Sequence, residues 1–180
     1  SNAINNIYQY VQPISGVPQG NYAPIVQLAA PTLLQIATVN GVYQPSNKTK
    51  IGFEIAGSKN DLNLFSNLDD NNNNGFAGKL TVEQNLIKND STWSLAAVLD
   101  TDYIQQDFKT IQRLYEPEFN RDWNLSQTNS ELLNTNLGNQ ALVSVGLKSF
   151  HLKKGYANYS FQHLNYSENF SGSKHNINAN

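Results

Sequence analysis

Apolar and polar positions alternate most regularly between residues 75 and 107. Over residues 76–87 the apolar parity is Phe76, Gly78, Leu80 and Val82, and the polar parity is Ala77, Lys79, Thr81 and Glu83. Over residues 92–102 one parity is Trp93, Leu95, Ala97 and Leu99. Because side chains alternate across a strand, the pattern predicts a long hairpin with one apolar and one polar face, joined by a tight turn at 88–91.

The same alternation predicts four further strands, at residues 33–43, 50–58, 141–152 and 156–166. Short turns at 44–49, 88–91 and 153–155 alternate with long, Asn-rich loops at 59–74 and 103–140. We therefore predict an all-β, mainly antiparallel fold, an up-and-down meander of about six long strands with all short turns at one end. The antiparallel domain would span residues 33–166.

After Asp102 the apolar spacing changes from two to that of a helix, through Ile104, Phe108, Ile111 and Tyr115. This spacing predicts a short helix over residues 103–115, with Asp102 as its N-cap and Pro117 beyond its end. The alternative is that the preceding strand continues past Tyr103. Further along the loop, the anchors that we expect are Phe119, Trp123 and Leu125.

The two ends of the chain carry no regular pattern. Proline and glycine recur every few residues through 4–32, which predicts an irregular segment. Residues 167–180 are predicted to be a polar tail without regular structure. Residues 1–3, Ser-Asn-Ala, resemble the remnant of a removed expression tag and are left out of fold reasoning. We expect the chain to be an internal piece of a longer protein.

Composition narrows the class of function. The net charge is −2 and charged residues make up 14% of the chain, so a basic nucleic-acid-binding surface is not expected. Polarity comes from neutral side chains, above all 27 asparagines. Cysteine is absent, which excludes disulfides, thiolate metal sites and a Cys nucleophile. The sequence contains no apolar run of about 18 residues, the length that a transmembrane helix needs.

The strand layout resembles outer-membrane β-barrels of Gram-negative bacteria, in which tight turns face the periplasm and long polar loops face outward. Residues 75–85, GFAGKLTVEQN, and 155–162, GYANYSFQ, look like barrel hairpins of large, poorly characterised cell-envelope proteins. Residues 118–125, EFNRDWNL, look like a sequence shared by such proteins. The resemblance covers about residues 33–166. It implies a location in the outer membrane or at the cell surface, and it brings no catalytic residues.

The sharpest local motif is a calcium-loop pattern at residues 70–75, DNNNNG. Asp70, Asn72, Asn74 and Gly75 match positions 1, 3, 5 and 6 of an EF-hand-like loop, and Phe76 would offer its carbonyl oxygen at position 7. Short oxygen-bearing side chains at alternate positions converge on one cation, and the glycine permits a sharp turn. Thr81 stands where a bidentate glutamate belongs. The alternative is a low-complexity Asn loop.

Other candidate chemistry is sparse. Asp100 and Asp102 share one strand face, as a pair of catalytic acids would, but the alternative is a strand end with Asp102 as a helix cap. His151, His163 and His175 lack zinc-ligand spacing. Neither a nucleophile elbow nor a phosphate loop occurs. Aromatic residues with amides around them are typical of sugar-stacking surfaces, and equally of packing: Tyr43, Trp93, Tyr103, Tyr115, Trp123, Tyr156, Tyr159 and Tyr166.

These patterns predict a non-enzymatic structural or binding portion of a cell-envelope, outer-membrane-type β protein with exposed Asn-rich loops. Its expected partners are the outer membrane or a glycan, with self-association through strand edges. The alternative is a soluble carbohydrate-binding β-sandwich, with calcium as the one candidate cofactor, covered by the 103–115 helix and the Pro-rich segment. A glycoside hydrolase fragment is a third interpretation, based on the acidic loop residues alone.

Overall fold

The computed structural model describes residues 9–20, 29–68, 70–88, 92–125, 138–167 and 169–180. It divides into two units, Ser1–Ala30 and Pro31–Asn180. Within the first unit, a bridge pairs Ile14 with Val17 around a turn in which Gly16 has a φ of 80°. Glycine adopts this left-handed conformation without a steric penalty. The second unit contains the sheet.

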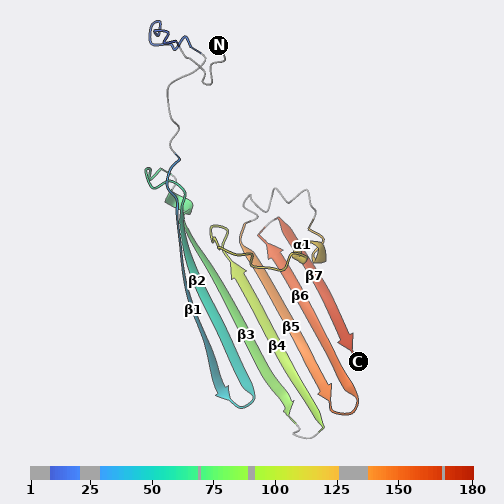
Figure 1. Cartoon of the computed structure of the whole chain (residues 1–180). Coiled ribbons are helices and arrows are strands. Elements are labelled where there is room, and N and C mark those ends of the chain that lie inside the picture. The colour runs from blue at the N-terminus through green and yellow to red at the C-terminus, as the bar shows by residue number, and fades with distance from the viewer. Residues whose placement is uncertain (1–8, 21–28, 69, 89–91, 126–137, 168) are drawn as a thin grey trace, which may run out of the picture. The chain divides into compact units, whose positions relative to one another are not determined.

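Seven antiparallel strands form one sheet in the order in which they occur along the chain (Figure 1). The strands are β1 (Leu33–Ser46), β2 (Thr49–Asp61), β3 (Asn74–Lys88), β4 (Trp93–Ile104), β5 (Gln140–His151), β6 (Gly155–Tyr166) and β7 (Phe170–Ala179). Helical structure among the described residues is limited to a 3-10 turn, η1 (Asp70–Asn72), and one turn of α-helix, α1 (Phe119–Asp122). Neither is long and apolar enough to cross a membrane.

The predicted all-β meander is confirmed for all six strands that the alternation indicated. The short turns after β1 and β5 lie at the same end of the sheet, as predicted (Figure 1). Residues 89–91 of the turn between β3 and β4 lie outside the described residues, as do residues 1–3. Since all the strands belong to one sheet, the two-sheet sandwich alternative does not describe this fold.

The predicted helix at 103–115 is wrong, and so is the role of Asp102 as its cap. Asp102 lies inside β4, and the strand continues to Ile104. One more backbone bond follows, from the Gln105 N–H to the Phe76 oxygen at 2.9 Å. Pairing with β3 satisfies these backbone groups and keeps the chain extended through Ile104. The alternative, that the strand continues past Tyr103, is therefore correct, and the strand ends one residue later at Ile104.

The predicted irregular tail is also wrong, because residues 170–179 form β7. The edge of β6 supplies backbone partners along the whole segment, from Tyr166↔Phe170 to Ala157↔Ala179. Two further bonds join Tyr156 and Asn180, with N···O distances of 2.9 and 3.0 Å. The segment is polar and has little tendency of its own to form a strand. Its structure comes from the free edge beside it.

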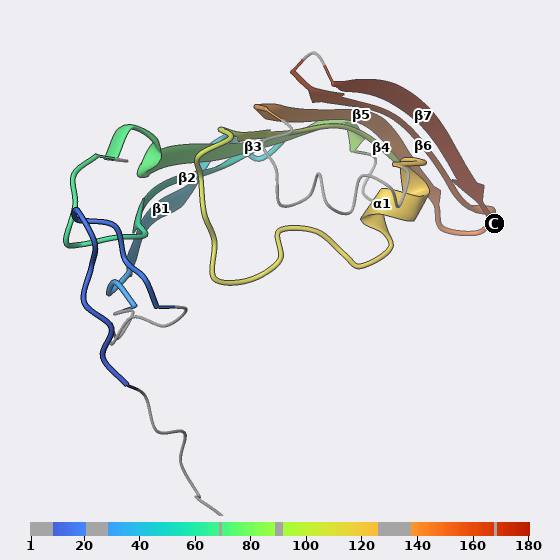
Figure 2. The same cartoon turned by 90° about the horizontal axis from the view of Figure 1, so that it is seen from above.

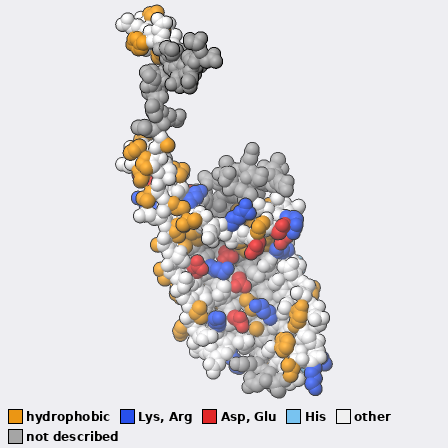
Figure 3. All heavy atoms as spheres, viewed as in Figure 1, with side chains coloured by type: hydrophobic (Ala, Val, Ile, Leu, Met, Phe, Trp, Pro, Cys, Tyr) orange, Lys and Arg blue, Asp and Glu red, His pale blue; other side chains and the backbone are white. Residues whose placement is uncertain are grey.

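The strand register divides the side chains between two faces. Row by row, Glu54 pairs with Lys79, Lys79 with Asp102 and Asp102 with Leu142, so these residues share one face. We call it the polar face, because the charged side chains of β3, β4 and β5 lie on it: Lys79, Glu83, Asp100, Asp102 and Lys148. Figure 3 shows these alternating charges gathered on the visible face.

The opposite face of the sheet, the apolar face, carries the other parity of each strand. Its large side chains include Val39, Tyr43, Phe53, Ile55, Phe76, Leu80, Trp93, Tyr103, Val145, Leu147, Tyr159 and Ile177, all of them exposed. The sequence prediction of one apolar and one polar face is confirmed. The unexpected finding is which face is covered.

The segment after β4 covers the polar face. Figure 2 shows residues 105–125 and α1 on the concave side of the curved sheet. A small core lies beneath this covering segment, where Trp123 packs against Leu164 and Tyr166. The expected anchors Phe119, Trp123 and Leu125 are confirmed as members of this cluster, with Leu142 and Phe170. The apolar face, in contrast, contributes none of the buried hydrophobic residues among those that the structure describes.

Candidate functional site

A groove of about 670 Å³ lies between the covering segment and the polar face. Its floor comes from side chains on β1 to β7, among them Thr38, Glu54, Lys79, Asp102 and Lys174. Its wall comes from the covering segment: Phe108, Thr110, Leu114, Tyr115, Glu116, Phe119, Asp122 and Trp123. Grooves of this volume are large enough for a small organic molecule.

Gly75 on the polar face lets the covering segment approach the sheet closely, because a Cβ added to it would clash with the backbone of Phe108. On β7, the Trp123 ring lies 3.6 Å from the place that a Cβ on Gly172 would take, an ordinary van der Waals distance. Nearby, the Lys109 N–H donates to the hydroxyl of Ser58 at 3.0 Å, and this serine is buried. The segment is therefore held to β2, β3 and β7 at separate points.

An aromatic row runs along the covering segment. Tyr115 stacks on Phe119 at a ring-centroid distance of 4.1 Å, and Phe119 lies 6.2 Å from Trp123. The Lys174 ammonium lies 4.6 Å from the centre of the Trp123 ring, on which it makes a cation–π contact. The sequence missed this row because its spacing of four crosses Pro117, which breaks any helical pattern.

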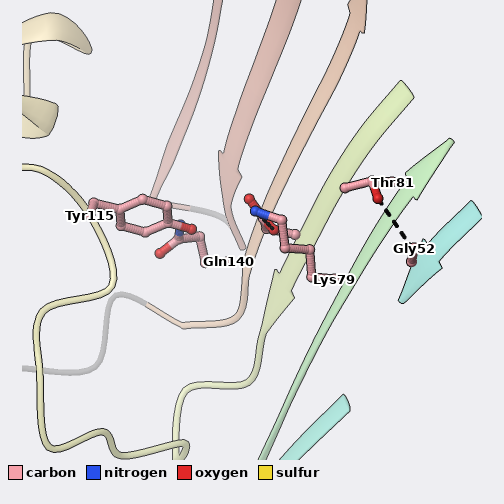
Figure 4. A network of polar contacts seen from close by, with 6 residues as sticks. Gly52, Lys79, Thr81, Tyr115 and Gln140 are labelled. Carbon is pink, nitrogen blue, oxygen red and sulfur yellow. Dashed lines mark hydrogen bonds and ion pairs between the residues drawn. The ribbon is translucent and has the colours of Figure 1, made fainter. Parts of the chain in front are cut away.

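Polar contacts on the polar face are local (Figure 4). Lys79 and Asp102, on the floor of the groove, form an ion pair at 3.5 Å, and the Thr81 hydroxyl donates to the Gly52 oxygen at 3.4 Å further along the sheet. The Gln140 amide donates to the Tyr115 hydroxyl, which joins the wall to β5. An exposed ion pair of this kind stabilises a fold by at most about 1 kcal/mol. The floor is therefore polar and solvated.

Two tyrosines on the covered side of the sheet have shifted ionisation: Tyr115 in the wall of the groove and Tyr166 in the buried cluster. Burial raises the pKa of Tyr166 to about 12. Burial also raises the pKa of Tyr115, and the nearby Asp102 and Tyr166 raise it further, whereas the hydrogen bond from Gln140 opposes the shift. Both phenols are therefore neutral over the physiological range.

The predicted calcium ligands are spread over the turn η1 and β3. The Asp70 carboxylate accepts a hydrogen bond from the Asn73 amide at 2.9 Å. Asn74 pairs with Lys59 at the start of β3, and the Phe76 carbonyl already accepts the Gln105 N–H. Gly75 is extended in β3 instead of forming a sharp turn, and its lack of a side chain makes room for Phe108. Calcium binding here, with Asn72 as a further ligand, stays a prediction.

The other candidate residues do not meet in one place. Asp100 and Asp102 share the polar face, as expected, but Asp102 is ion-paired with Lys79. Within the described part of the chain, no group of three acidic or histidine side chains forms a metal site. The register divides the eight aromatic residues of the glycan hypothesis. The apolar face carries Tyr43, Trp93, Tyr103 and Tyr159, and the polar face or its covering segment carries Tyr115, Trp123, Tyr156 and Tyr166.

His163 and His175 face the same side of β6 and β7 and make hydroxyl contacts. His163 Nδ1 lies 2.9 Å from the Ser173 hydroxyl, and His175 Nδ1 lies 2.9 Å from the Tyr159 hydroxyl. These contacts make the β7 end of the apolar face more polar than its centre.

Comparisons with family models, curated proteins and solved structures found no match to the chain.

Proposed function

We propose that this chain is a non-enzymatic wall segment of an outer-membrane-type β structure in the cell envelope. Its apolar face would contact lipid, and its polar face would line the interior. The observation that carries the proposal is the uncovered apolar face, since large exposed apolar patches mark protein or membrane contacts. Soluble sheets bury this kind of face, whereas a sheet in a bilayer exposes it and keeps its charges on the other side.

The dimensions of the apolar face support this proposal. On β4, Trp93 and Tyr103 lie ten residues apart on that face and bracket Leu95, Ala97 and Leu99. At about 3.4 Å per residue and a tilt of about 45°, this stretch spans roughly 24 Å of bilayer. Barrel walls carry an apolar band of about 25 Å with aromatic residues at both borders. In β3, β4 and β5 the charged residues lie on the opposite face.

The two tryptophans provide a direct test, because one lies on each face. Trp93 is exposed on the apolar face, whereas Trp123 belongs to the covering segment and is buried against the polar face. In Trp123→Phe protein, vesicles of phosphatidylcholine brominated near the glycerol backbone should quench the Trp93 emission, because aromatic residues at the border of the apolar band lie at that depth. In Trp93→Phe protein, the remaining Trp123 should be quenched much less. Equal quenching of both, or of neither, contradicts the proposal.

A matched pair of charge substitutions tests the same proposal by vesicle flotation. Leu80→Lys places a charge near the middle of the apolar face and should cost about 2–4 kcal/mol of membrane binding. Thr81→Lys places the same charge one residue further, on the polar face, and should leave binding close to that of the unmodified chain. Equal loss in both variants contradicts the proposed orientation. A chain that stays monomeric in buffer, does not bind vesicles and binds a glycan supports the carbohydrate-binding alternative.

A further inference from the structure

The free edge of β1 is long and unguarded. Within β1 only Leu33 and Gly41 are half-buried, and the other residues are exposed. The strand carries no charged residue, and its one proline, Pro45, lies at the turn end beside the irregularity between Tyr43 and Ser46. Edge strands of soluble proteins are normally guarded by lysine, proline, bulges or short length. Over residues 33–43 this strand has none of these guards.

The backbone groups of β1 that face away from the sheet can be assigned from the pairing. The Asn60 N–H bonds the Asn73 oxygen and the Asn85 N–H bonds the Lys48 oxygen, so even residues of β2 bond to β3. Antiparallel bonding alternates, so odd residues of β2 bond to odd residues of β1. The outward-facing N–H and C=O groups of β1 therefore belong to Leu34, Ile36, Thr38, Asn40 and Val42.

Strand direction decides which strand fits this edge. Seven strands alternate in direction, so β1 and β7 run the same way. Pairing of β7 with the β1 edge of another copy would be parallel, which is slightly less stable per residue. Pairing of β1 with a second β1 is antiparallel, and a two-fold axis perpendicular to the sheet keeps both apolar faces on the same side.

From this geometry we infer that β1 pairs with β1 of a second copy of the chain, with Val39 on the two-fold axis. This register overlaps nearly the whole strand and pairs Thr38 with Asn40, and Ile36 with Val42, on the polar face. On the apolar face the two Val39 side chains meet. The outward hydrogen-bonding groups of both β1 strands are then satisfied, and the seven strands of each copy join into one continuous antiparallel sheet of 14 strands.

The other edge is less suited to the same pairing. β7 carries Lys174 in its middle, and three of its five outward positions, Ser171, Ser173 and His175, are polar, whereas Ile177 and Ala179 are not. Two copies of Lys174 near a β7–β7 axis would repel each other, as like charges do across paired strands. The inference therefore concerns β1 alone.

The absence of cysteine from the sequence allows a clean crosslinking test. Val39→Cys places two thiols at a non-hydrogen-bonded pair, where the Cα atoms lie about 4.5 Å apart, within disulfide range. Mild oxidation in non-ionic detergent, which covers the apolar face, should convert most of the protein to a dimer. The matched control is Ile177→Cys on the same face of β7, which is 80% exposed against 67% for Val39. It should stay monomeric.

A blocking variant tests the same edge without a crosslink. Thr38→Pro removes an outward N–H and none of the β1–β2 bonds, so the sheet should still form. Sedimentation in detergent should give twice the monomer mass of 20.0 kDa for the unmodified chain and the monomer mass for this variant. Amide exchange in the unmodified dimer should protect the even positions of β1.

Several results would overturn the inference: no dimer at micromolar concentration, equal crosslinking of the Val39→Cys and Ile177→Cys proteins, or a Thr38→Pro protein that still dimerises. The self-pairing is also separable from the proposed membrane role. Crosslinking and mass report the edge of the sheet, whereas lipid quenching reports the apolar face, so either can fail while the other holds.

Discussion

The two faces of the sheet invert the arrangement of a soluble β protein. The polar face, with its ion pair between Lys79 and Asp102, is covered by residues 105–125 and holds the buried cluster around Leu164. The apolar face is bare from Val39 on β1 to Ile177 on β7. This difference shows that hydrophobicity alone does not decide which face of the sheet the covering segment packs against. The close approach at Gly75 and a few aromatic anchors direct the segment to the polar face.

Truncating one leucine on each face should give the largest difference between them. Leu164 is fully buried on the polar face, whereas Leu147 is 44% exposed on the apolar face. Leu164→Ala should lower the free energy of unfolding by about 2–5 kcal/mol, since it leaves a cavity under Trp123. Leu147→Ala should change it by less than about 0.5 kcal/mol in buffer. Urea unfolding followed by circular dichroism measures both, and equal losses would show that the apolar face is also packed.

Adding one methyl group to a glycine on each face should give the next largest effect. A Cβ at Gly75 meets the Phe108 backbone, whereas a Cβ at Gly78, on the apolar face, meets its nearest neighbour at 3.6 Å. Gly75→Ala should cost about 1–3 kcal/mol, as overpacked sites do, and should shift the emission of Trp123. Gly78→Ala should do neither. Unchanged stability in Gly75→Ala would mean that the covering segment does not contact β3 in solution.

Alkaline pH should weaken the polar face selectively. The pKa of Tyr166 is raised to about 12 and that of Tyr115 is also raised, so the unfolded chain loses these protons first, near pH 10. The stabilisation is therefore fully present below pH 10 and is lost as the pH rises from about 10 to 12. Melting midpoints across this range should fall, and less steeply in the double variant Tyr115→Phe, Tyr166→Phe. An identical slope would contradict the assignment.

The smallest expected effect concerns the loop before β3. If Asp70 and its neighbours bind calcium with a dissociation constant near 1 mM, then about 5 mM calcium adds about 1 kcal/mol of stability. The melting midpoint should rise with calcium, but not in Asp70→Ala protein, and magnesium is the control. An unchanged midpoint at millimolar calcium would end this hypothesis.

The sequence by itself determined six of the seven strands, their order and the two faces. A period of two is a local property, so each segment such as 76–87 carries its own signal, and the short turns leave few ways to connect the segments. Alternation also placed Lys79 and Leu80 on opposite sides before any pairing was known. The aromatic anchors Phe119 and Trp123 were likewise recognisable as large apolar residues in a polar loop.

Only the tertiary structure decided where the covering segment lies, that it is not a helix, and that the chain ends in a strand. These outcomes depend on partners distant in the sequence: Gly75 beneath Phe108, Gln140 beside Tyr115, and the free edge of β6 beside residues 170–179. At residues 103–105 the adjacent strand β3 supplies the backbone partners in place of a helical turn. A polar segment likewise becomes a strand when an edge offers it hydrogen bonds.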